Sequence, residues 1–182
     1  MTIYFPEAVT VQESTKVALC TTIADLTAPS IASEIKAVTT VEATMAFRDW
    51  APTLTPNTGN APARLGTAVQ LPVEGNIPLS AIATAYPWDP SADDADVNNE
   101  VKALMIRNTL LYVVVRKGID ITTDWAAGQP VDVWHVRCGF QDDDATSSGA
   151  GSGGGSTDEF AEFEVHQNLF PLSLKTRGTL AA

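Results

Sequence analysis

The chain has 182 residues, which suits one domain with a substantial core. Hydrophobic residues make up 45% of it, too many for a disordered chain. Eleven basic residues face twenty-two acidic ones, giving a net charge of -11, so the chain lacks the basic surface with which nucleic-acid-binding domains neutralise phosphates. An acidic surface repels DNA, which is useful where DNA must pass without sticking.

Neither a signal peptide nor a membrane span is predicted. Residues 1–6 contain no basic stretch followed by a long apolar run, and no segment is apolar over the length of a bilayer crossing. We therefore expect a protein made in a cytoplasm. Cys20 and Cys138 lack the spacing of metal ligands, so two buried thiols are expected, with a disulfide as the less favoured alternative.

The first part of the chain predicts an arm, two strands and one helical turn. Residues 1–14 are polar and predict an extended arm, and residues 16–26 predict a strand. Ser30 is expected to cap a short helical turn that runs through Glu34. Residues 38–47 alternate between apolar and polar, which predicts a half-buried strand with an inward face of Val41, Ala43, Met45 and Phe47.

A long loop follows at residues 49–66. It holds three prolines and almost no large apolar side chain. Connections longer than about 12–15 residues in compact domains are usually functional or disordered. Residues 69–86 return to extended structure, in which Pro72 and Pro78 fit edge strands or strand starts.

The second half predicts one helix and most of a sheet. Residues 96–108 place Val97, Val101, Leu104 and Met105 on one helical face. Residues 110–115 are continuously apolar, which is typical of a central strand buried on both faces. Residues 131–140 predict another strand, whose alternation slips near Trp134 and indicates a bulge or burial on both sides.

Two closing strands complete the predicted fold. Residues 160–170 and 172–179 are expected to form them, after a flexible Gly/Ser-rich loop at 145–157. The pattern as a whole predicts a mainly β protein, an antiparallel sandwich or barrel with one flanking α-helix, in a single domain over residues 1–182.

No catalytic, cofactor-binding or metal-binding constellation is predicted. Glycines inside 145–157 match the spacing of a nucleotide-binding loop, but no helix follows them. The acids at 94–98 open like a calcium loop that then lacks its required Gly and Glu. His135 and His166 are the only histidines, and with two scattered cysteines they do not predict a zinc site. An enzyme is therefore not expected.

Several motifs in order along residues 15–180 resemble the major tail tube proteins of long-tailed, siphovirus-type phages of actinobacteria. The similar stretches are APSIASEI at 28–35, ARLG at 63–66, YPWDP at 86–90, YVVVRKG at 112–118, DWAAGQPVDVW at 124–134 and VRCG at 136–139. The chain departs from the family pattern at 141–157, where the Gly-rich run looks like an insertion.

The resemblance implies a structural virion protein. Such subunits form hexameric rings that stack into a hollow tube around DNA, and the inner sheets of neighbours join, which satisfies their open strand edges. The implied partners are further copies of the chain, a tape measure protein and a tail terminator. DNA would pass through without specific binding, no membrane is involved, and the protein would reside in the virion tail after synthesis in the bacterial cytoplasm.

The resemblance also implies that the loop at 49–66, the N-terminal arm and the last strand reach neighbouring subunits. The residues we expect at inter-ring or inter-subunit contacts are Trp50, Pro52, Leu54, Pro56, Asn57, Arg64, Leu65, Arg116 and Lys117. Arg116 and Lys117 are otherwise interpreted as a solubilising pair.

Two alternatives remain open. A tail terminator or baseplate component would use the same fold and stop at one ring. A monomeric β-sandwich that binds a receptor or a carbohydrate would display an exposed aromatic patch, for which Trp50, Trp88 and Trp125 are the candidates.

Overall fold

The computed structural model describes residues 13–48, 50, 52, 54, 56–60, 72–74, 77–93, 96, 99–146 and 162–182. The predictions for the arm at 1–12, for 61–66 and for 147–157 lie outside this range. The elements, in chain order, are β1 (Thr15–Cys20), η1 (Ile31–Ile35), β2 (Val41–Glu42), β3 (Thr58–Asn60), β4 (Pro72–Glu74), β5 (Ile82–Pro87), α1 (Glu100–Leu104), β6 (Leu110–Lys117), β7 (Pro130–Thr146), β8 (Phe163–Pro171) and β9 (Thr176–Thr179).

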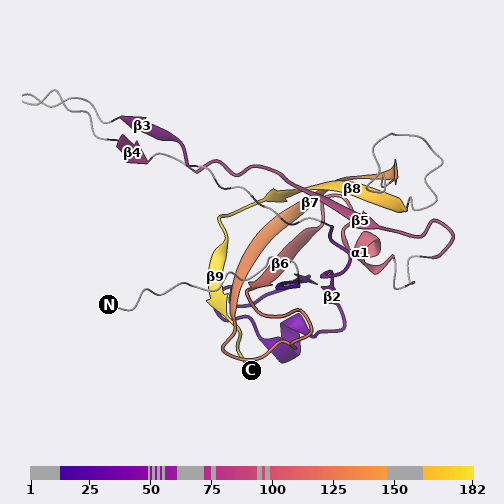
Figure 1. Cartoon of the computed structure of the whole chain (residues 1–182), viewed down its shortest axis with the longest axis horizontal. Helices are drawn as coiled ribbons and strands as arrows, with labels where there is room; N and C mark the ends of the chain where they lie inside the picture. Colours follow the sequence, from indigo (N-terminus) through magenta and orange to yellow (C-terminus); the bar gives the residue numbers. More distant parts are fainter. Residues whose placement is uncertain are drawn as a thin grey trace, which may run out of the picture.

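One curled antiparallel sheet dominates the molecule (Figure 1). Its seven strands follow the order β2-β1-β6-β7-β8-β5, and β9 also pairs with β7. β7 is 17 residues long and therefore carries β9 beside its first residues and β8 beside the rest. The prediction of a mainly β, antiparallel sandwich or barrel architecture with few helices is confirmed.

The sheet buries apolar side chains on both faces, because successive residues of a strand point to opposite sides. The larger cluster, the main core, includes Leu19, Val113, Trp134, Val136 and Leu169. The second cluster includes Cys20, Val114 and Val133 and is covered by Ile35 of η1, Trp125 and Leu180. β6 lies centrally, with Val113, Val114 and Val115 at most 1% exposed, as its continuous apolar sequence predicts.

The two cysteines lie on opposite faces of this sheet. Cys138 belongs to the main core and Cys20 to the second cluster, and both are free thiols. Desolvation by burial raises the pKa of Cys20 to about 11 and that of Cys138 to about 12. Each thiol therefore stays protonated at neutral pH and packs as a small hydrophobe.

The predicted Ser30 cap is confirmed. The Ser30 hydroxyl accepts the N–H of Ser33, and the Glu34 carboxylate accepts the N–H of Ser30 at 2.7 Å. The other Glu34 oxygen accepts the N–H of Ala24 at 2.6 Å. One carboxylate thus fixes both the helical turn and the preceding loop, and the strand predicted over 16–26 ends earlier, at the end of β1.

The helix predicted over 96–108 is wrong in extent, because α1 has only five residues. On its N-terminal side the Asn99 amide donates to the backbone carbonyl of Asp89 at 3.0 Å, which folds the preceding loop back. On its C-terminal side Asn108 adopts a φ of 68° and donates its N–H to the carbonyl of Cys138 at 2.8 Å. The chain therefore leaves the helix and enters the sheet at a point where the sequence still shows helical periodicity.

The strand predicted over 38–47 is also mostly wrong, since β2 has only two residues. The backbone carbonyl of Ala43 accepts the N–H of Phe47 at 2.9 Å, which closes a turn. Met45, expected on the inward face, is 83% exposed, and Val38 is fully exposed. The slip expected near Trp134 corresponds to burial on both faces there, while the β-bulges of β7 lie farther along, after Cys138.

Candidate assembly surfaces

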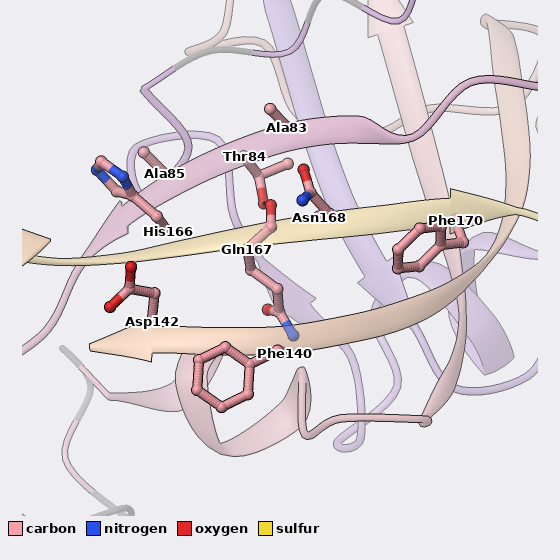
Figure 2. Close-up of a pocket in the computed structure, with 9 residues that line it drawn as sticks. All are labelled: Ala83, Thr84, Ala85, Phe140, Asp142, His166, Gln167, Asn168 and Phe170. Atoms are coloured by element: carbon pink, nitrogen blue, oxygen red, sulfur yellow. Dashed lines mark hydrogen bonds between the residues drawn. The ribbon is translucent and has the colours of Figure 1, made fainter. Parts of the chain in front are cut away.

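Part of the sheet has one face that no other described element covers. We call this the open face: it belongs to β5, β8 and the second half of β7, and it points away from the main core. Figure 2 shows its side chains around a hollow of about 630 Å³. The open face consists of Ala83, Ala85, Phe140, Asp142, His166, Asn168 and Phe170.

The open face is uncharged over most of its area and carries two exposed aromatic rings. Phe140 is 67% and Phe170 is 40% exposed. Its ionisable groups are Asp142 and His166, and His166 lies 3.3 Å from the buried carboxylate of Glu164. None of these seven residues is Lys or Arg, but the exposed Arg137, the register partner of Phe170, borders the face, with its guanidinium 5.9 Å from the centroid of the Phe170 ring. Exposed aromatic side chains on a small neutral surface indicate a contact surface or a channel wall.

The same three strands expose two unpaired edges within the described part of the chain. β5 pairs with β8 on one side, and on its other side the N–H of Arg48 donates to the carbonyl of Ala85 at 3.1 Å, with no strand paired there in the described ranges. β6 pairs with β7 only up to Arg137, so the remainder of β7 has no strand on that side. Unpaired edges of this kind pair readily with further strands.

β3 and β4 form a separate two-stranded ribbon. The two strands pair with each other in register from Thr58↔Glu74 to Asn60↔Pro72 and join no other sheet. The ribbon projects from the body on the side opposite α1 (Figure 1). Part of the loop predicted at 49–66 is strand β3 of this ribbon.

The residues expected at inter-subunit contacts divide into two groups by position. Trp50 and Leu54 pack against the main core, and the Trp50 ring stacks on Phe47 at 6.0 Å and meets Trp134 edge-on at 6.3 Å. Pro52 and Pro56 are half-buried, and Asn57 is exposed at the base of the ribbon. Arg64 and Leu65 lie outside the described residues. The contact role of these residues stays a prediction.

Arg116 and Lys117 differ sharply in how far their side chains are buried. The Arg116 side chain is fully buried and donates hydrogen bonds to the backbone carbonyls of Asp120, Thr123 and Asp124 and to the Gln129 side chain. Its interpretation as a solubilising residue is therefore wrong, because the guanidinium holds a loop of its own subunit. Lys117 is exposed and borders a hollow of about 290 Å³.

A second hollow of about 560 Å³ lies beside α1, and we call it the Trp88 groove. Its lining is Pro87, Trp88, Asp89, Pro90, Ser91, Glu162 and Phe163. Trp88 and Phe163 meet edge-on at 6.4 Å. From the sequence, Trp88 was expected only as a member of an aromatic patch. Sequence patterns do not reveal this mixture of apolar and acidic side chains, because the two segments that line the groove, 87–91 and 162–163, are more than 70 residues apart.

Other candidate chemistry finds no support in the described residues. No cluster of three or more His, Cys, Asp or Glu residues there is placed to hold a metal ion. His135 stacks on Tyr112 at 4.6 Å. Trp125 is only 6% exposed and Trp50 packs on the core, so the three tryptophans of the binding-module alternative do not form one exposed patch. No helix in the described ranges is long and apolar enough to cross a membrane.

A curled antiparallel sheet with open edges, an open face and a projecting ribbon defines a structural protein whose surfaces suit contacts with other chains. The family model of phage tail tube proteins matches residues 4–152. This chain therefore belongs to the phage tail tube protein family and is a structural component of a phage tail tube. A search of curated proteins gives no match.

Proposed function

We propose that this chain is the major tail tube protein of a siphovirus-type actinobacteriophage, which assembles into stacked hexameric rings. The observation that carries the proposal is the pair of open edges on opposite sides of one three-stranded unit. If the β5 edge of one copy pairs with the free edge of β7 in the next, the contact is head-to-tail, and such contacts form a ring when the rotation between successive copies closes. Backbone hydrogen bonds then fill both edges.

The open face suits the wall of a channel through which DNA passes. Within a closed ring made by these edges, the open face lies on one side of the joined sheet and the main core on the other. The seven residues that form it include one carboxylate and no Lys or Arg, and Arg137 at its border lies over the Phe170 ring, so the face offers few cations to neutralise phosphates. The net charge of -11 adds a general repulsion.

The projecting ribbon favours a stack of rings over a single-ring terminator. The ribbon joins no other sheet, and isolated two-stranded ribbons are marginal in water. We infer that it contacts a neighbouring subunit. A tape measure protein inside the tube and a terminator at its end are the further partners in this proposal, which places the protein in the virion tail after synthesis in the host cytoplasm.

Replacing residues 58–74 by a short Gly/Ser turn tests the role of the ribbon. The cut leaves Trp50 and Leu54 on the main core, so we expect a subunit that folds with an unchanged far-ultraviolet spectrum. We expect negative-stain images of this variant to show no long tubes. Tubes of normal length from the shortened chain would contradict the proposal that the ribbon links subunits.

A further inference from the structure

We propose that the Trp88 groove is the receptor for residues 61–71 of a second copy, the segment that follows β3 and precedes β4 in the sequence. This inference rests on the proposed function and names the surface that receives the ribbon. The groove and the ribbon lie at opposite ends of the longest axis of the subunit, since α1 and the loop after β5 are on one side and the ribbon is on the other (Figure 1). Copies related head-to-tail therefore bring one to the other.

The groove is organised before any partner arrives. The Lys102 ammonium lies 3.3 Å from the centroid of the Trp88 ring and is held there by Asp143 at 3.0 Å. The backbone N–H of Trp88 donates to the carbonyl of Phe163 at 3.1 Å. A partner therefore does not need to order the indole on binding, which lowers the entropic cost of docking.

The groove combines an apolar floor with an acidic rim. Phe163 is 53% exposed, and prolines 87 and 90 extend the apolar surface. Asp89 and Glu162 supply the acids, and Glu162 also pairs with Arg48. Aromatic and proline-lined grooves accept extended, proline-containing segments, and an acidic rim selects a basic residue among them.

Residues 61–71 match these requirements in composition. The segment reads APARLGTAVQL, with Pro62, Leu65, Val69 and Leu71 as apolar groups. Arg64 is the only Lys or Arg between residues 49 and 80. The segment thus presents one cation among apolar residues. It complements a groove at which the carboxylates, Asp89, Asp143, Glu162 and Glu164, outnumber the cations, Arg48 and Lys102.

Disulfide trapping in the full-length, assembled protein tests the contact. The variant carries Ala63→Cys and Ser91→Cys, and the matched control carries Ala63→Cys and Thr122→Cys, so that Arg64 is kept in both. Ser91 and Thr122 are both exposed, and each hydroxyl donates to an aspartate two residues earlier at 2.6 Å, so the two substitutions disturb their loops equally. The native cysteines are buried.

We expect mild oxidation of the Ser91 pair to give a ladder of covalent multimers on a non-reducing gel, with a yield about tenfold or more above the Thr122 pair. Adding Phe163→Ser to the Ser91 pair should reduce the yield about tenfold, because it removes an aromatic anchor of the groove. Tubes that form normally but give no ladder overturn this inference and leave the proposed function intact. Unmodified protein that stays monomeric at high concentration overturns the proposed function and this inference with it.

Discussion

At the scale of single residues, Arg116 shows how a charge can serve folding instead of contact. Its guanidinium is fully buried, donates to three backbone carbonyls and one amide oxygen, and lies 5.1 Å from the centroid of the Trp125 ring. A planar group with several fixed donors can satisfy diverging carbonyls in this way, whereas an ammonium group cannot. Arg116 therefore anchors the loop between β6 and β7 to the sheet.

Replacing Arg116 by Met should lower the free energy of unfolding by about 3 kcal/mol, because the loop carbonyls lose their donors inside the protein. Urea unfolding followed by tryptophan fluorescence measures the loss. Arg116→Lys should recover only a small part of it. The exposed neighbour supplies the control, since Lys117→Met should change stability by less than about 0.5 kcal/mol. Equal effects of Arg116→Met and Lys117→Met would contradict the anchoring role.

At the scale of elements, a buried amide network holds the second half of β7 in place. The Gln167 side chain donates to the carbonyls of Met105 at 2.8 Å and Gly139 at 3.0 Å, and it accepts the Tyr86 hydroxyl at 2.9 Å. Gln141 donates to the same hydroxyl at 3.1 Å. The network ties the bulge of β7 to the residue that ends α1 and to β5, so it fixes the strands that carry the open face.

Gly139 is the tightest point of this arrangement. A Cβ there would lie 2.6 Å from the Asn168 carbonyl oxygen and 2.9 Å from the Phe170 ring. Gly139→Ala should therefore destabilise the fold by about 1–3 kcal/mol and shift the β7–β8 pairing. Thermal unfolding, with the exposed Asn168→Ala as control, measures the effect. A melting temperature as high as that of the control would show that the strands separate without cost at this position.

Sequence alone predicts the strands whose burial is continuous and misses those whose ends depend on distant partners. The apolar run from Leu111 to Val115 specifies a central strand wherever it packs. The helix after residue 96 is shortened because Asn108 bonds to Cys138, which lies in another strand, and no local periodicity reports such a bond. Tertiary contacts thus override propensity at element ends.

The candidate surfaces also divide into a part that the sequence could predict and a part that it could not. The alternation of Val165, Gln167 and Leu169 with His166, Asn168 and Phe170 would have identified the two faces of β8 from sequence, and with them part of the open face. The Trp88 groove could not be predicted, because it requires residues 87–91 and 162–163 to meet. The burial of the Arg116 side chain could not be predicted either, because a charged residue next to Lys117 at a strand end ordinarily faces solvent.

At the scale of the whole molecule, one side of the sheet is packed, and the other is packed only where η1 and the loop before β7 cover it. The seven residues of the remaining open face include one aspartate and no Lys or Arg, in a chain of net charge -11. In the proposed tube this face lines the channel, and DNA meets few cations there, with Arg137 beside Phe170 at its border. The proposed passage of DNA without retention then depends on the side chains at a few exposed positions of the open face.

Introducing Asn168→Lys should convert that wall into one that retains DNA. Six copies per ring would place repeated cations along the channel, and retention should fall steeply as salt rises. Co-sedimentation of assembled tubes with DNA at several salt concentrations measures this. Thr122→Lys, in an exposed loop away from the open face, is the control and should retain less. Equal retention by both variants would contradict the placement of the open face in the channel.

The central claim is that copies of this chain join through their sheet edges into stacked rings. Negative-stain electron microscopy of the purified full-length protein at high concentration tests it most directly. The account predicts hollow tubes of uniform diameter, or stacked rings with six-fold end views. A homogeneous monomer under the same conditions, with an intact β spectrum, would contradict it.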